Sequence, residues 1–503
     1  MSTYHVENFG CRATQADGAA LARQFEERGL KQAPSAHADL VILNTCTVTA
    51  AADQDARAAI RRVQRQNPNA RIIVTGCYAQ RAPEEVGALA GVSAVIGNSH
   101  KHQLADLALQ ENFAGSEKMA ATFVPLAALS GNIRNRQLGA GSRFFVSDIF
   151  AHTELLGAPV FDETVAASRG GLRTRPNLKV QDGCDNRCSF CVIPSVRGQS
   201  RSLPLEQVLH EVNALVAAGY REVVISGINL GRWGRDLGNA GFRLQASGSG
   251  QSSFEKSGSF GQEPPNFEDL IRAILCETAL EKLRISSVEP MDWSDELIRL
   301  VAESPRIAKH AHVPLQSGSD AVLRRMHRKY RPWHYQGKIE KIRAAMPAAA
   351  IGADVMVGFP GETEAEFDAT RRLIEDLPFT YLHVFTYSAR PGTPAADMPN
   401  QVPVQVARER NRILRELAAE KKRSFMKSFI GRTVDAITLG SVEAGTSEGT
   451  ETVPSAAHVA EAFTEALTDN YLKVRIKGHH AANHWAKVEV RAVEGDALIA
   501  DVR

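Results

Sequence analysis

The feature that most constrains this chain is a group of three cysteines within eight residues, Cys184, Cys188 and Cys191. Each iron of a cubane iron–sulfur cluster takes one thiolate, so three cysteines leave the fourth iron open. An open coordination position is typical of metal sites that do chemistry. A zinc site would need a fourth ligand, and residues 177–209 hold no histidine or further cysteine. The spacing therefore favours a reactive iron–sulfur loop over a zinc knuckle or a chance group of buried cysteines.

Cysteine usage and composition suggest a reducing compartment. The chain of 503 residues has seven cysteines, an odd number, and its first residues lack the basic and apolar regions of a secretion signal. These features argue against a disulfide framework and favour metal ligation. No run of about 18 apolar residues occurs, so we expect a cytoplasmic protein without a membrane span. The net charge of +2 means that any nucleic-acid-binding surface must be local.

Three further cysteines occupy equivalent places in a predicted N-terminal domain, residues 1–120. Cys11, Cys46 and Cys77 each follow a predicted strand, where the strand gives way to a loop. The strands alternate with helices, which predicts a parallel sheet whose carboxyl ends meet at one edge. A lone cysteine is often a small buried hydrophobe. Three at equivalent strand ends instead predict a second iron–sulfur cluster with three protein thiolates.

Six strand–helix units follow in residues 177–400. Their strand cores are expected at 179–181, 222–227, 282–287, 309–315, 351–358 and 381–387. Six units predict a partial (β/α)6 barrel resembling part of a TIM barrel, with its active site at the carboxyl-end loops. The Cys184 loop follows the first strand and therefore belongs to that site.

The remaining segments predict an α/β multidomain protein with a small β-barrel at its end. Residues 121–176 are a connector, and 235–265 are a flexible Gly/Ser-rich surface loop. Residues 401–427 form a helix whose excess of cations favours a phosphate-facing surface over an ordinary solvated face. Residues 428–503 contain short alternating strands typical of a barrel that binds single-stranded RNA. Cys276 lies in a helix pattern and is expected in the core.

The C-x3-C-x2-C spacing resembles that of the radical S-adenosylmethionine (SAM) enzymes. With Cys11, Cys46, Cys77 and the terminal barrel, it resembles the methylthiotransferases over nearly the whole chain. The motifs are similar to the branch that acts on threonylcarbamoyladenosine next to the anticodon of tRNAs, whose terminal barrel is of the TRAM type. They are Asn8-Phe-Gly-Cys-Arg, Asn44-Thr-Cys-Thr-Val-Thr, Gly76-Cys-Tyr-Ala-Gln, Lys179-Val-Gln-Asp-Gly-Cys-Asp and Ala466-Leu-Thr-Asp-Asn-Tyr-Leu-Lys-Val.

The resemblance implies two [4Fe-4S] clusters, one on each cysteine trio, and SAM bound to the open iron of the Cys184 loop. One electron from that cluster cleaves SAM to a 5′-deoxyadenosyl radical. The reaction converts the carbon between the two pyrimidine-ring nitrogens from C–H to C–S–CH3, with a second SAM as methyl donor. A radical is needed because no side chain attacks an unactivated aromatic C–H bond.

The resemblance and position in the barrel loops suggest a set of SAM contacts, each of which is equally consistent with a structural role. They are Phe190, Gly227, Asn229, Ser287, Glu289, Gln316 and Asp354. The implied partners are the tRNA anticodon loop, an electron donor such as flavodoxin or ferredoxin, and an unidentified sulfur donor. The protein is expected to act as a monomer.

Three alternatives stay open from the sequence. The same chemistry on isopentenyladenosine in tRNA is the nearest, and the methylthiolation of an aspartate on a ribosomal protein is the second. The third is an iron–sulfur RNA-binding regulator without turnover. Two open-iron sites serve no purpose in simple binding, which disfavours the regulator.

Overall fold

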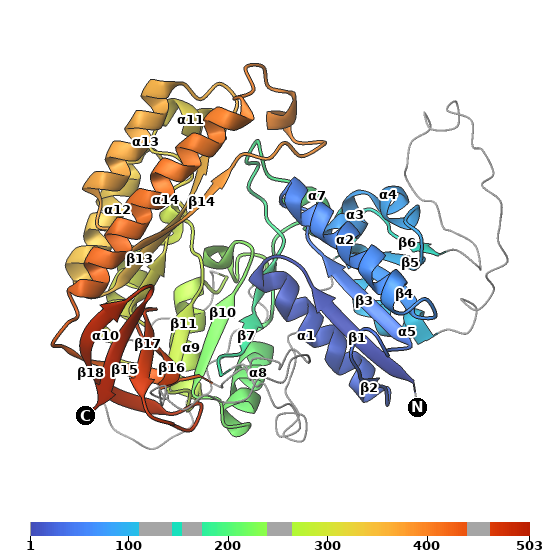
Figure 1. The fold of residues 1–503 in the computed structure, drawn as a ribbon, viewed down its shortest axis with the longest axis horizontal. Helices are drawn as coiled ribbons and strands as arrows, with labels where there is room; N and C mark the ends of the chain where they lie inside the picture. The colour runs from blue at the N-terminus through green and yellow to red at the C-terminus, as the bar shows by residue number, and fades with distance from the viewer. Residues whose placement is uncertain (1, 110–142, 153–173, 239–263, 440–462) are drawn as a thin grey trace, which may run out of the picture.

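The computed structural model describes residues 2–109, 143–152, 174–238, 264–439 and 463–503. These residues form an N-terminal α/β unit, a central barrel of strands and helices, and a small β-barrel at the end of the chain (Figure 1). Most of the predicted flexible loop, 235–265, and much of the predicted connector, 121–176, lie outside the described residues. No helix among the described residues is both long and apolar enough to span a membrane.

The N-terminal unit contains a six-stranded, all-parallel sheet in the order β2-β1-β3-β4-β5-β6. The strands are β1 (Thr3–Asn8), β2 (Lys31–Gln32), β3 (Leu40–Thr45), β4 (Arg71–Gly76), β5 (Val92–Gly97) and β6 (Phe144–Phe145). Its helices are α1 (Arg12–Glu27), α2 (Ala50–Gln66), α3 (Cys77–Arg81), α4 (Pro83–Gly87), η1 (Asn98–Gln103) and α5 (Leu104–Leu109). Strand β6 comes from the segment predicted as a connector.

Local sequence explains these elements. Every residue of β3 is buried, as expected for a strand of a parallel sheet covered by helices on both faces. Helix α2 begins after Thr49, whose side chain accepts a hydrogen bond from the Ala52 N–H at 3.2 Å. One detail of the prediction was wrong. Cys77 does not enter a loop but is the first residue of the short helix α3.

The central unit has the six predicted strands, which pair in parallel as β7-β10-β11 and β12-β13-β14. A parallel bridge between Ser287 and His312 joins the two sets into one curved sheet. The partial barrel is thereby confirmed. The strands are β7 (Asn177–Lys179), β10 (Glu222–Ser226), β11 (Lys282–Ile285), β12 (His310–His312), β13 (Ala350–Val357) and β14 (Tyr381–Thr386). Strands β8 (Gln181–Asp182) and β9 (Arg201–Ser202) form a separate two-stranded sheet beside them.

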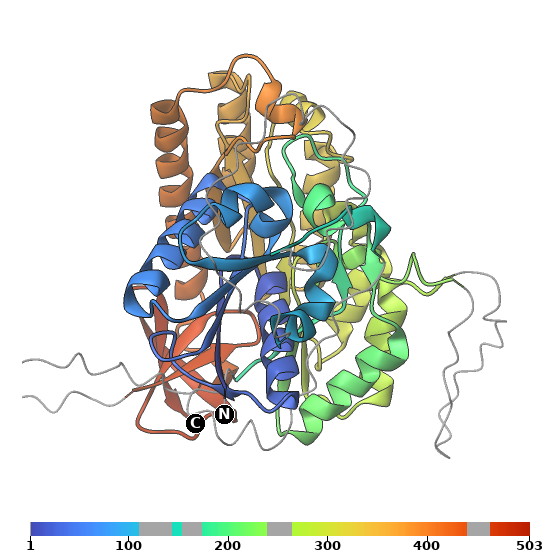
Figure 2. The same ribbon diagram turned by 90° about the vertical axis from the view of Figure 1, so that its right-hand side faces the viewer.

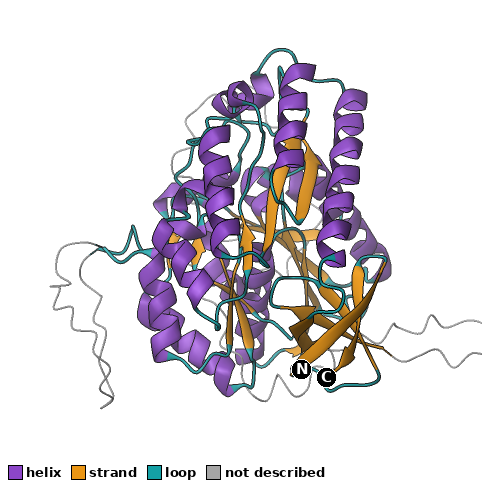
Figure 3. Ribbon diagram, turned by 90° about the vertical axis from the view of Figure 1, so that its left-hand side faces the viewer, coloured by secondary structure: helices purple, strands orange, loops and turns teal. Residues whose placement is uncertain are grey.

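Helices cover the outer face of this curved sheet (Figure 3). Two begin with reciprocal capping boxes, Asn266 with Asp269 and Thr363 with Glu366, which fix where the helices start. The helices of this unit are α7 (Ile193–Arg197), α8 (Leu205–Ala217), α9 (Phe267–Glu277), α10 (Asp295–Glu303), α11 (Asp320–Arg325), α12 (Pro332–Ala345), α13 (Glu364–Asp376) and α14 (Val404–Lys427).

The expectation for Cys276 was wrong, because this residue is exposed. Helix α9 buries a face that includes Phe267, Leu270, Ile271 and Ile274. At about 100° per residue, position 276 points away from that face.

Helix α14 is the predicted basic helix, and part of its charge is neutralised within the chain. Arg410 is buried and forms an ion pair with Glu362 at 2.8 Å. Arg412, at the surface, pairs with Glu409 and Glu416. The helix packs along β14, so one face of it is structural.

The predicted C-terminal barrel is confirmed, and it is closed, with five strands in the order β15-β16-β17-β19-β18. Its strands are β15 (Thr433–Thr438), β16 (Phe463–Thr468), β17 (Lys473–Lys477), β18 (Trp485–Glu494) and β19 (Ala497–Val502). Figure 2 shows the N-terminal unit in front of the central strands, with the small barrel beside its lower end.

Candidate active site

The Cys184 loop connects β8 to α7 and is held by backbone hydrogen bonds. The Cys184 N–H donates to the Gly198 carbonyl, and the Cys191 N–H donates to the Cys188 carbonyl, both at 3.1 Å. Gly183, with φ of +70°, makes the turn into the loop, where a Cβ would lie 1.8 Å from the Gln199 carbonyl oxygen. The three cysteines are partly exposed.

Cationic and amide donors surround these sulfurs. Arg328 Nη1 donates to Cys188 Sγ at 3.2 Å, and Asn229 Nδ2 donates to Cys184 Sγ at 3.6 Å. Arg328 also forms an ion pair with Glu289. Burial raises the pKa of Cys191 to about 12, so this thiol ionises only if a metal or another strong positive charge stabilises the thiolate. A donor set made only of thiols, with N–H groups aimed at two of them, fits an iron–sulfur cluster.

Four predicted SAM contacts lie around this loop. The Asn229 N–H donates to Gln181 Oε1 at 2.7 Å, and a Cβ on Gly227 would lie 2.8 Å from the same oxygen. Glu289 is the partner of Arg328, which bonds to Cys188. Phe190 lies within the loop and packs edge-on against Phe359, with ring centroids 6.5 Å apart.

The other three predicted contacts lie along the neighbouring strands. The backbone of Ser287 forms a parallel β-bridge with that of His312, and the Gln316 N–H donates to the Asp354 carbonyl at 2.8 Å. Gln316 has φ of +61°, and its buried Oε1 has no hydrogen-bond partner among the described residues. The Asp354 carboxylate lies 3.3 Å from His312 Nε2. Asp354 therefore belongs to a histidine group on the concave face of the sheet.

The second cysteine trio lies at the carboxyl edge of the N-terminal sheet. Cys46 and Cys77 are buried and Cys11 is exposed. Gly10 has φ of +97°, and a Cβ there would lie 2.7 Å from Cys46 Sγ, so the chain before Cys11 passes directly over Cys46. Burial, and then the neighbouring Cys77 thiol, raise the pKa of Cys46 to about 12. The buried Cys46 and Cys77 thiols are therefore better suited to bind a metal cluster, which stabilises the thiolate, than to remain free.

The strand-end trio contacts the segment that follows the Cys184 loop. Cys77 packs against Val192 and Val196, which directly follow the Cys184 loop. Asn98 Nδ2 lies 3.6 Å from Cys77 Sγ and donates to the Val196 carbonyl at 2.8 Å. The sites predicted from two distant parts of the sequence are therefore adjacent.

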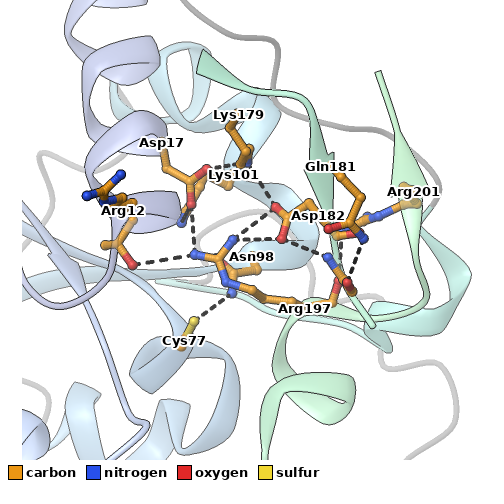
Figure 4. A network of polar contacts seen from close by, with 12 residues as sticks. Arg12, Asp17, Cys77, Asn98, Lys101, Lys179, Gln181, Asp182, Arg197 and Arg201 are labelled. Carbon is orange, nitrogen blue, oxygen red and sulfur yellow. Dashed lines mark hydrogen bonds and ion pairs between the residues drawn. The ribbon is translucent and has the colours of Figure 1, made fainter. Parts of the chain in front are cut away.

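A buried ionic network joins the two units beside these cysteines (Figure 4). Asp17 of α1 pairs with Lys101 and with Arg197 at 3.0 Å each, and also with Lys179. Asp182 pairs with Lys179 and Arg197 at 2.9 Å each. These residues line a cavity of about 20 Å³, the size of a single water site. Three cations face two carboxylates, and the excess positive charge lies near Cys77.

A second junction follows Cys46. Thr47 donates to Asp53 at 2.6 Å, and Arg81 pairs with Asp53 at 2.9 Å. Arg390, which follows β14, also donates to Thr47 at 3.1 Å and pairs with Asp53. The N-terminal unit is thus fixed to both sides of the opening in the central barrel.

A third group of residues, here called the inner cluster, occupies the concave face of the central sheet. Ala311, Ala353 and Leu382 pack into the core on the outer face, so their neighbours along each strand point inward. His310 and Tyr381 form a hydrogen bond at 2.6 Å, and His312, Asp354 and His383 have ligand atoms within 4.8 Å of one another. The inner cluster consists of Arg12, His310, His312, Asp354, Tyr381, His383 and Tyr471.

Comparison with known proteins agrees with this architecture. The family model described as "Uncharacterized protein family UPF0004" matches residues 3–97, and that of the "Radical SAM superfamily" matches 178–374. The threonylcarbamoyladenosine tRNA methylthiotransferase of Bacillus subtilis is 33% identical, over 95% of this chain and 91% of its own length. The tRNA-2-methylthio-N(6)-dimethylallyladenosine synthase of Novosphingobium aromaticivorans is 32% identical, over 86% of each chain.

The chain belongs to the radical SAM methylthiotransferase family. It is therefore an enzyme that uses a [4Fe-4S] cluster and SAM, which confirms the coarser part of the prediction. Among solved structures, the radical SAM methyltransferase TsrM of Kitasatospora setae aligns with a TM-score of 0.49 and 15% identity. That alignment covers 79% of this chain and 77% of TsrM.

The methylthiotransferase has site residues that sequence reasoning missed. Arg328 follows α11 in a loop with no recognisable motif, and Asn98 opens η1. The network residues Asp17, Lys101 and Arg197 come from three distant segments. A signal was available only for Lys179, because a charged residue within a buried strand core demands a partner.

Proposed function

We propose that this methylthiotransferase acts on tRNA and converts N6-threonylcarbamoyladenosine next to the anticodon into its 2-methylthio derivative. The polarity of the inner cluster carries this proposal. A threonylcarbamoyl group brings a carboxylate, a hydroxyl and amide groups, which need polar partners, whereas an isopentenyl group needs an apolar pocket. Histidine, tyrosine and arginine side chains surround the concave face, and His383 at its edge is exposed. The name of the Bacillus subtilis relative supports the same substrate.

The proposed roles of the chain follow from the geometry. Cys184, Cys188 and Cys191 hold three irons of the cluster that binds SAM, while Arg328 and Asn229 orient two of these sulfurs. With SAM bound, this cluster supplies a carbon radical that removes the hydrogen from the target carbon, and a second SAM supplies the methyl group. The proposed SAM contacts are Phe190, Gly227, Asn229, Ser287, Glu289, Gln316 and Asp354.

Cys11, Cys46 and Cys77 are proposed to hold a second [4Fe-4S] cluster that carries the sulfur. Their position supports this role, because Cys77 packs against Val192, which directly follows Cys191 of the other trio. A sulfur source must lie close to the carbon on which the radical forms, since that radical reacts with the first suitable partner it meets.

The RNA surface is proposed to combine the terminal barrel with one face of α14. Four cations of α14 are exposed and form no ion pair within the described parts of the chain: Arg408, Arg415, Arg423 and Lys427. They lie on the side of α14 that does not carry the buried Arg410. Cations free of carboxylate partners are available to RNA phosphates.

Nucleoside mass spectrometry of tRNA from cells with and without the gene tests the proposal. Loss of only the 2-methylthio form of threonylcarbamoyladenosine supports it. Loss of the isopentenyl form would assign the enzyme to the alternative suggested by the Novosphingobium relative. Unchanged tRNA, with a methylthiolated aspartate lost from a ribosomal protein, would overturn the RNA substrate. Altered RNA binding without any lost methylthio group would point to a regulator.

A further inference from the structure

Arg12 is a cation of the inner cluster whose position is fixed from two sides. It directly follows Cys11 and is the first residue of α1. Its backbone carbonyl accepts a hydrogen bond from Asn177 Nδ2 of β7 at 2.9 Å, and its Nη2 donates to the Tyr471 hydroxyl at 3.2 Å. Within the described ranges, Arg12 forms no ion pair. The guanidinium is therefore anchored without being neutralised.

The neighbouring arginines differ from Arg12 in this respect. Arg284 is fully buried and forms an ion pair with Glu222. Arg175 lies 3.7 Å from the same carboxylate. Both cations have a structural partner, whereas the partly exposed Arg12 has a free charge on a concave, solvent-accessible surface.

Tyr471 is placed for this contact at a conformational cost. It lies in the turn between β16 and β17 with φ of +68°, a region that bulky residues rarely adopt. Arg284 donates to the carbonyls of Asp469 at 2.9 Å and Thr468 at 3.2 Å, which holds this turn in place. The Tyr471 ring lies 4.9 Å from His310. Such retained strain is characteristic of functional positions.

His310 and His383 of the inner cluster do not replace Arg12 as an anion receptor. Burial lowers the pKa of His310, and Arg284, His312 and Arg12 lower it further. Burial also lowers the pKa of His383; Asp354 opposes this effect, and His312 and Arg12 add to it. Near neutral pH His310 and His383 are therefore hydrogen-bonding groups, and Arg12 is the fixed positive charge.

We propose that Arg12 binds the carboxylate of the amino-acid substituent on the target adenine, with Tyr471 as its positioning residue. This inference rests on the proposed function. In adenine the reacting C2 and the substituted C6 both flank N1, so the substituent lies on the same edge of the base as the reacting carbon. Arg12 is one residue from Cys11, a proposed ligand of the sulfur-carrying cluster. One segment of chain thus presents both the sulfur site and the anion receptor.

The test uses the reconstituted full-length enzyme and anticodon stem-loop RNAs carrying threonylcarbamoyladenosine, its methyl ester or isopentenyladenosine. Both kcat/KM and the affinity for each RNA in the absence of SAM are measured. We expect wild type to lose about 100-fold in kcat/KM on the ester, because esterification removes the charge that Arg12 binds. R12Q should lose about 100-fold in kcat/KM on the acid, and its kcat/KM on the ester should stay close to that of wild type on the ester. R12K keeps the charge without the planar fork and loses about tenfold on the acid.

R23Q is the matched control, because it removes the same charge from the same helix about three turns away. Arg23 pairs with Glu27 at the surface, so R23Q should behave as wild type on every RNA. Y471F should weaken acid binding severalfold while leaving ester binding unchanged, which a merely structural role of the hydroxyl would not produce.

The outcomes separate this inference from the proposed function. If wild type modifies only isopentenyladenosine, the proposed function fails and the carboxylate receptor fails with it. If wild type modifies threonylcarbamoyladenosine but R12Q loses equal factors on acid and ester, the proposed function stands. Arg12 would then not meet the carboxylate, and the inference would be overturned. An R12Q loss confined to the acid, in both binding and turnover, supports it.

Discussion

The two cysteine trios provide similar ligands in different ways. Cys184, Cys188 and Cys191 come from one short loop and remain partly exposed. Cys11, Cys46 and Cys77 come from the ends of three strands of a parallel sheet, and two of them are buried. A loop can present ligands with little help from the rest of the fold. The strand-end trio exists only once β1, β3 and β4 are paired.

The difference in access matches the proposed roles. In its proposed role the Cys184 loop admits a cofactor that is consumed in each turnover, and its three cysteines are partly exposed. The strand-end trio is reached at Cys11, beside Arg12, while Cys46 and Cys77 lie within the protein. In the proposed mechanism the Cys184 trio thus activates SAM, and the strand-end trio delivers the sulfur.

The largest effects are expected when one cysteine of either trio is replaced, and they differ between the two trios. C188A and C46A should each lower the iron content of the reconstituted enzyme by about four atoms per chain. C188A should abolish both SAM cleavage and methylthio product, because it removes a ligand of the activating cluster. C46A should abolish the product and leave SAM cleavage. Iron analysis and chromatography of both products measure this, and methylthio product from C46A would break the division of roles.

The buried network between the trios gives the next largest effect. D17N leaves Lys101, Lys179 and Arg197 with one carboxylate fewer in a fully buried site. Breaking a buried ionic network in this way costs about 3–5 kcal/mol of unfolding free energy. Urea denaturation measures it. D106N is the control, since Asp106 pairs with Arg28 at the surface and should cost less than about 1 kcal/mol.

The same carboxylate predicts how stability depends on pH. Burial alone would raise the pKa of Asp17, but Lys101, Lys179 and Arg197 outweigh burial and lower it. The unfolded chain then takes up a proton at about pH 3.9 while the folded chain does not. The stability that Asp17 contributes is therefore complete above that pH and is lost as the pH falls toward the lower folded value. Below about pH 4 wild type should lose stability more steeply than D17N, and parallel curves would contradict this.

Sequence alone predicted the parts of this enzyme whose signal is local or periodic. The Cys184 spacing, the six strand cores and the strand-end positions of Cys11 and Cys46 are visible in short windows. Arg328, Asn98 and Asp17 were not predictable in this way, because each acts through a partner from a distant segment that only the fold brings near. Cys276 was misplaced because the prediction rested on the frequent burial of lone cysteines, whereas position 276 points away from the buried face of its helix.

Substitution of the residues that donate to the sulfurs should have effects of intermediate size. R328Q removes the donor to Cys188, and N98A removes the donor to Cys77. Each should cost about 10–100-fold in the step that its own cluster performs. R328Q should therefore slow SAM cleavage and product formation together, whereas N98A should slow only product formation. R324Q, at an exposed neighbour paired with Asp320, is the control. Slower SAM cleavage in N98A would show that the two sites do not act separately.

The smallest effect concerns the seventh cysteine. Cys276 is exposed on α9 and lies apart from both trios, so C276S should change the unfolding free energy by less than about 0.5 kcal/mol. Its iron content and both reaction rates should equal those of wild type. This null result matters to the comparison, because it would show that thiol chemistry alone does not recruit iron. Loss of iron in C276S would instead mean that a cysteine outside the two trios takes part in cluster assembly.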